Sequence, residues 1–107
     1  MTDKVVVLVT CGSAKEARRI AKAVVEQKLA ACVNILDARV HSIYRWKGKV
    51  EFAREFLLVM KTSRRRMATL QKKIEQLHSY DVPEIIALPI VAGSPGYLAW
   101  IADSVRR

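Results

Sequence analysis

The chain has 107 residues and a formal net charge of +9, and hydrophobic residues make up 51% of it. This hydrophobic share excludes a globally disordered chain, and the length suits one domain over residues 1–107. The sequence holds no apolar run near the roughly 20 residues of a membrane-spanning helix. The apolar stretch that follows the first four residues is too short for a secretion signal. The sequence therefore predicts a cytoplasmic protein without a membrane partner.

The first third of the chain alternates strand and helix patterns. Residues 4–10 form a continuous apolar run, which is typical of a central strand buried on both faces. Ser13 followed by Glu16 is a capping-box pattern, and apolar residues then recur at helical spacing until about Lys28. Residues 29–35 predict a second strand, and residues 36–39 predict an interruption such as a bulge.

A long β-hairpin is predicted over residues 40–62, with its turn at Lys47 and Gly48, because glycine readily adopts the positive φ of a tight turn. If residues 49–62 form one strand, it is about 46 Å long, whereas a globule of this size is roughly 34 Å across. The hairpin should therefore project from the domain. The alternative is a bulge or second turn at residues 51–54, which would shorten the strand.

Aromatic residues gather near the end of this predicted hairpin, at Tyr44, Trp46, Phe52 and Phe56. A projecting ribbon with exposed apolar side chains and unpaired backbone groups favours pairing between chains. We therefore expect a homo-oligomer.

Two further helices and a strand complete the chain. An apolar stripe from Met67 to Leu77 predicts a helix that Thr62 or Ser63 could cap. Residues 78–83 are expected to form a connection, and residues 84–91 a strand. Pro89 places this strand at a sheet edge or indicates a bulge. Residues 94–105 are expected to form the last helix. The order β-α-β-β-α-β-α predicts an α+β, ferredoxin-like antiparallel sheet with both crossover helices on one face and an added C-terminal helix.

The positive charge favours attraction to polyanions. Basic residues gather on one side of the second predicted helix, at Arg64, Arg65, Arg66, Lys72 and Lys73. No aromatic residues are interleaved with them, as nucleic-acid binding modules require. A solvated basic surface explains the pattern equally well, so nucleic acid is not an expected partner.

Catalysis is not predicted either. A serine or cysteine nucleophile needs a base within hydrogen-bond reach, and neither His41 nor His78 stands near a nucleophile motif. Cys11 and Ser13 lie between the first strand and the first helix, where the helix N-terminus could hold an anion or lower the pKa of the thiol. The alternative is that Ser13 only caps the helix and Cys11 packs at the strand end.

Copper and related ions prefer thiolate, imidazole and thioether ligands, to which carboxylates can add. The candidate ligands of these types are Cys11, Cys32, His41, Met60, Met67, His78 and Glu84. His78 and Glu84 flank a short connection, so both could point into one cleft. The alternative for His78 is a solvent-facing or hydrogen-bonded structural role. Cys32 falls in a predicted core strand and should be inert, and the two methionines are most simply packing residues.

Six blocks follow one another along the chain: VVVLVT, LAACVNI, SIYRWKG, EFLLVMKT, HSYDVPEIIALPI and YLAWI. Together they closely resemble the CutA divalent-cation-tolerance family over almost the whole chain. The resemblance implies a ferredoxin-like protomer, a homotrimer built by pairing of the long hairpins, and a likeness to PII-type trimeric signalling proteins. It also implies a response to copper or other divalent cations, with no established catalysis.

The resemblance carries the metal positions over as His78 and Glu84. Ser79 replaces the proline usual after this histidine, and Val9 stands where some members have a cysteine. Cys11 lies two residues further, about 7 Å along the strand, and is the third candidate ligand.

Two functions follow as hypotheses. The first is a trimeric metal-tolerance protein that binds copper or a similar ion weakly. The second is a PII-like regulatory module whose clefts between protomers take a small anionic ligand or a partner protein, through basic residues beside Tyr80 and Trp100.

Overall fold

The computed structural model describes residues 2–106, with the backbone alone at Asp37. Met1 and Arg107, the two ends of the predicted 1–107 unit, lie outside the described residues. The elements in chain order are β1 (Lys4–Cys11), α1 (Ala14–Glu26), β2 (Cys32–Trp46), β3 (Lys49–Ser63), a 3₁₀ turn (Arg64–Arg66), α2 (Met67–Leu77), β4 (Ile85–Pro89) and α3 (Pro95–Ser104).

The strands form one antiparallel sheet in the order β2-β3-β1-β4, so the predicted ferredoxin-like arrangement is confirmed. β1 lies inside the sheet, as its continuous apolar run predicts. β4 is an edge strand, where the missing backbone donor of Pro89 costs least. Within residues 2–106, no helix is long and apolar enough to cross a membrane.

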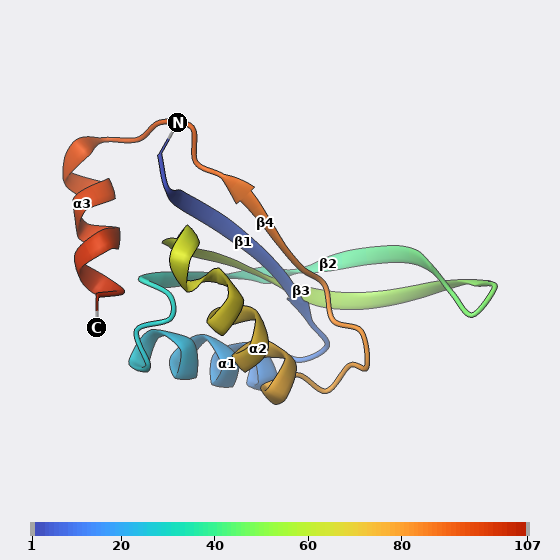
Figure 1. Ribbon diagram of the computed structural model, residues 1–107. Coiled ribbons are helices and arrows are strands. Elements are labelled where there is room, and N and C mark those ends of the chain that lie inside the picture. The colour runs from blue at the N-terminus through green and yellow to red at the C-terminus, as the bar shows by residue number, and fades with distance from the viewer. Residues whose placement is uncertain (1, 107) are drawn as a thin grey trace.

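The core lies between one face of the sheet and helices α1 and α2, which run side by side beneath it (Figure 1). Alternate residues of β1, from Val5 to Cys11, point toward this core. They pack with apolar residues of α1 such as Ile20 and of α2 such as Ile74. Burial of these side chains is the main favourable contribution to folding.

The helix starts differ from the sequence-based expectation in one respect. Ser13 caps α1 as predicted, since its Oγ accepts the Glu16 N–H at 3.1 Å. The predicted cap of the second helix is wrong, because Ser63 makes no capping bond and the Thr62 hydroxyl donates to the Leu29 carbonyl at 2.7 Å. Arg66 is buried, so it does not belong to a solvated basic face.

The hairpin projects from the globule, as its length predicts. β2 and β3 each have 15 residues, whereas β1 ends at Cys11, opposite Phe56. The pairing runs unbroken from Val40 and Glu55 to Trp46 and Lys49, so the alternative of a break at residues 51–54 is wrong. The expected irregularity before the hairpin is present between residues 36 and 40. The molecule measures 44 × 25 × 25 Å, with the hairpin extending along its long axis (Figure 1).

Positive φ angles of 51° at Lys47 and 80° at Gly48 close the turn. Two consecutive positive φ angles give the backbone twist that suits a tight hairpin.

The other face of the sheet is not covered by α1 or α2. Because partners across the ladder share a face, the pairing places one set of apolar side chains there: Val6, Leu8, Leu36, Leu57, Val59, Ile86 and Leu88. We call these seven residues the open face. Ile86 is 50% and Leu88 46% exposed, which is high for side chains of this size. Helix α3 packs at one end of the sheet, through Ile101 and Val105.

Candidate functional site

The connection after α2 returns His78 to the end of β1. The Nε2 atom of His78 lies 2.7 Å from the Thr10 carbonyl oxygen, and the Tyr80 N–H lies 3.1 Å from Nδ1. Because a backbone N–H can only donate, Nδ1 must accept and the ring proton must be on Nε2. His78 is therefore a neutral imidazole whose two nitrogens both have partners. This geometry agrees with the alternative for His78, a hydrogen-bonded structural role.

Cys11, Glu16 and His78 form a buried cluster in which one potential ligand atom from each residue lies within 4.8 Å of the others. The Glu16 carboxylate accepts the Ser79 N–H at 2.9 Å and lies 3.6 Å from Nη2 of Arg19. Glu16 therefore ties α1 to the connection after α2. Sequence reasoning missed it as a site residue, because its capping-box position had already given it a local role.

The thiol of Cys11 is not activated. Burial, together with the negative charges of Glu16 and Glu55, raises its pKa to about 12. The possibility that the helix N-terminus lowers the pKa of this thiol is therefore wrong, because desolvation and the nearby carboxylates raise the pKa. The alternative, in which Cys11 packs at the strand end, is confirmed by its place in the core.

The donor types of this cluster suit copper or zinc, but their state in this structure does not. His78 has no free lone pair, the thiol of Cys11 keeps its proton at neutral pH, and Glu16 already accepts a backbone N–H. An ion could enter only if His78 gave up one of its two hydrogen bonds. The cluster is thus closed to a resident ion in this conformation.

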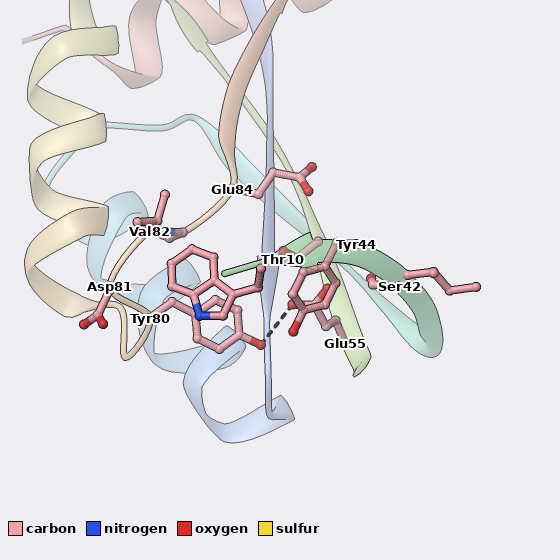
Figure 2. Close-up of a pocket in the computed structure, with 11 residues that line it drawn as sticks. Thr10, Ser42, Tyr44, Glu55, Tyr80, Asp81, Val82 and Glu84 are labelled. Carbon is pink, nitrogen blue, oxygen red and sulfur yellow. Dashed lines mark hydrogen bonds between the residues drawn. The ribbon is translucent and has the colours of Figure 1, made fainter. Parts of the chain in front are cut away.

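A separate pocket of about 670 Å³ opens where the hairpin passes the connection between α2 and β4 (Figure 2). Its lining residues are Thr10, Ser42, Ile43, Tyr44, Trp46, Glu55, Tyr80, Asp81, Val82, Pro83 and Glu84. Figure 2 shows the Tyr80 hydroxyl directed at Glu55, to which it donates at 2.9 Å. Burial and this hydrogen bond both raise the pKa of Tyr80, so the phenol stays protonated.

The structure thus brings Cys11 and His78 together and leaves Glu84 outside their cluster, on the wall of the pocket. The other candidate ligands have simpler roles. Met60 is fully buried and Met67 packs against the core, as predicted, and His41 is exposed on the hairpin. Cys32 is not in the core: it is partly exposed, with Sγ 3.6 Å from the Tyr97 hydroxyl, because it starts β2 on the face turned away from α1.

An antiparallel four-stranded sheet with two crossover helices on one face and a projecting hairpin defines the ferredoxin-like, PII-like class of α+β proteins. Within that class, residues 5–104 match the family model of the CutA1 divalent ion tolerance protein. The chain belongs to this family.

The relatives agree over most of the chain. A divalent-cation tolerance protein CutA of Thermus thermophilus is 48% identical over 99 residues, which cover 92% of this chain and 95% of that protein. The chloroplastic protein CutA of Arabidopsis thaliana is 43% identical over 103 residues, 96% of this chain but only 56% of the plant protein. These names describe tolerance proteins or simply CutA, and not enzymes.

Solved structures give the same result. CutA of Xylella fastidiosa superposes with a TM-score of 0.94 at 34% identity and covers 98% of this chain and 100% of its own. The periplasmic divalent cation tolerance protein CutA of Archaeoglobus fulgidus gives a TM-score of 0.92 at 40% identity, covering 96% and 99%.

The expectation of a cytoplasmic location is wrong. It rested on the lack of a leader-like segment, yet one close structural relative is described as periplasmic and a plant relative as chloroplastic. A small, self-contained fold of this kind is compatible with several compartments.

The two cysteines should differ sharply in reactivity toward an aromatic disulfide reagent at about pH 8. We expect rapid modification of the partly exposed Cys32, and modification of the buried Cys11 only after unfolding in guanidinium. The Cys32→Ser variant should lack the rapid phase. Rapid labelling of that variant in its folded state would contradict the assigned environment of Cys11.

The stability of the folded chain should also depend on Cys11 at high pH. Its pKa in the folded state, about 12, lies above its ordinary value of 9.0, so the folded state holds the proton more tightly. The stability from this group is therefore complete below about pH 9 and is lost as the pH rises toward 12. Denaturant titrations should show a shallower decline in that range for Cys11→Ala than for the unmodified chain. Parallel declines would exclude this coupling.

Proposed function

We propose that this chain is a homotrimeric divalent-cation tolerance protein that acts as one domain and has no catalytic role. The observation that carries the proposal is the open face, on which Leu36, Ile86 and Leu88 are exposed, on the sheet of a family named for cation tolerance. Monomers seldom expose apolar patches of this kind without a partner. Pairing of protomers through this face and along the projecting hairpins would bury it.

The hairpin supports assembly through its helix-side face as well. Ile43 pairs with Phe52, and Val50 lies on the same face one step closer to the tip. Phe52 is 74% exposed because the body of the protomer ends before it. Tyr44 and Trp46, which the sequence also suggests as contact residues, lie on the other face of the hairpin, where they line the pocket.

The cation in this proposal is copper or a similar divalent ion, taken as cargo and not as a resident cofactor. Its candidate ligands are Cys11 and His78, with Glu16 added, and Glu84 lies in the adjoining pocket. Binding should be weak, because it must break a hydrogen bond of His78 and remove the proton of a thiol whose pKa is about 12.

The regulatory alternative, in which an anion binds beside Tyr80 and Trp100, is not favoured. The pocket at Tyr80 is lined by carboxylates, and no basic residue is among the lining residues that the structure describes. Helix α3, which carries Trp100, lies at the end of the molecule opposite the hairpin (Figure 1).

Assembly should fail when charge is placed on the open face. We expect Leu88→Glu to dissociate the trimer into folded protomers, because a carboxylate would be buried in an apolar contact. The control is Val25→Glu, which changes an exposed valine on α1, away from the open face. Sedimentation velocity is the measurement. A trimer that survives Leu88→Glu would show that this face is not the contact.

Copper binding should depend on the buried cluster. Calorimetric titration with Cu²⁺ should give weak, saturable binding that fades as the pH falls through the range where histidine ligands take up protons. We expect His78→Ala and Glu16→Gln to weaken it strongly. His41→Ala, which alters an exposed histidine on the hairpin, should bind normally. Unchanged binding by both cluster variants, with folding checked by circular dichroism, would show that these ligands are wrong.

A further inference from the structure

Glu55 is a buried carboxylate without a cationic partner. It is 6% exposed, and in the described part of the chain no ion pair includes it. Its hydrogen-bond partner is the Tyr80 hydroxyl, which donates to Oε2. A buried charge normally needs a countercharge or several hydrogen bonds, and one neutral hydroxyl supplies only part of this. No buried side-chain oxygen of the described residues lacks a hydrogen-bond partner, so the second oxygen of Glu55 is reached by solvent and is open to a positively charged partner.

The pocket in front of Glu55 supplies room for such a partner. Its volume of about 670 Å³ falls in the range of small-molecule sites. Asp81 and Glu84 add carboxylates to its wall, and none of the described residues that line it is a lysine or arginine. In a chain of net charge +9, this concentration of acidic groups sets the pocket apart from the rest of the surface.

Aromatic and apolar groups form the remaining walls. Ser42, Tyr44 and Trp46 alternate along β2 and so present one face of the hairpin to the pocket. Val82 and Pro83 belong to the connection on the other side of the pocket, where Figure 2 shows Val82. Aromatic faces attract ammonium and guanidinium groups. The Trp46 ring already does so, since Nζ of Lys47 lies 5.9 Å from its centre.

We propose that this pocket binds an organic cation: an ammonium or guanidinium group placed at Glu55, carried on an apolar or aromatic body that packs against Tyr44 and Trp46. A bare metal ion fits less well. Among the described residues, the group of three closely spaced histidine, cysteine or acidic ligands is Cys11, Glu16 and His78, so the carboxylates of the pocket do not converge on one point. The residues that line the pocket all come from one protomer.

Two sources can provide the same positive group. One is a free small molecule. The other is a lysine or arginine side chain of a second copy of this chain, whose hairpin tip is rich in such residues, at Arg45, Lys47 and Lys49.

The test uses tryptamine, which joins an ammonium group to an aromatic body, with tryptophol as its neutral analogue and indole-3-acetate as its anionic one. Isothermal titration calorimetry on the full chain should show binding of tryptamine only. Glu55→Gln should weaken it roughly 10- to 100-fold, the effect of losing one charge-assisted hydrogen bond. Trp46→Leu, on an exposed part of the hairpin, should also weaken it, and Glu75→Gln on the exposed face of α2 should not.

A basic side chain from a second copy of the chain, the second source, would give a different result. If a basic side chain of another copy fills the pocket, tryptamine should lower the sedimentation coefficient of the assembled protein, and Glu55→Gln should do the same. The proposal is overturned if tryptamine neither binds nor alters assembly, if tryptophol binds equally well, or if neither Glu55→Gln nor Trp46→Leu changes the response.

Discussion

The structure depends on a difference in strand length. β1 stops at Cys11, whereas β2 and β3 continue for the length of the hairpin beyond it. Strand pairing holds most of the overhanging part, since α1 and α2 do not extend beneath it (Figure 1). Its apolar side chains on the helix side therefore face no core, and its other side forms one wall of the pocket, opposite the returning connection. Both the proposed contact surface and the proposed binding site follow from the early end of one strand.

The alternation of side chains along each strand then determines which residues lie on each side of the hairpin. On β3, the even-numbered side chains lie on the helix side of the sheet. Near the helices they are buried in the core, as Leu58 is, and further out along the hairpin they are exposed, as Phe52 is. The odd-numbered side chains lie on the other side of the sheet. Leu57 belongs to the open face, and Glu55, the next residue on that side, lies just beyond the end of β1. The position of Glu55 is notable because the connection after α2 brings Tyr80 over it there. A shift of one residue in register would exchange these faces, so the hairpin register fixes both surfaces.

The features that sequence predicts well are those set by local pattern. The apolar run of residues 4–10 gives a central strand, Ser13 gives a helix cap, and the length of the hairpin gives its projection. The features that the sequence does not predict depend on contacts between segments that are far apart in the chain. Glu16 is buried because Ser79 donates to it from 63 residues away, and Glu55 is buried because Tyr80 covers it. The periodicity of the sequence does not predict these contacts, because they depend on the path of the connection after α2.

The same limit applies to the metal site. A sequence displays histidine, cysteine and carboxylate as available donors, but availability is a property of hydrogen bonding and desolvation in the folded state. Here His78 uses both ring nitrogens to fasten the connection to β1, and that fastening holds Tyr80 above Glu55. An ion that took His78 as a ligand would have to loosen the segment that forms one wall of the pocket. The buried cluster and the pocket therefore share the segment of residues 78–80, which no local pattern in the sequence reveals.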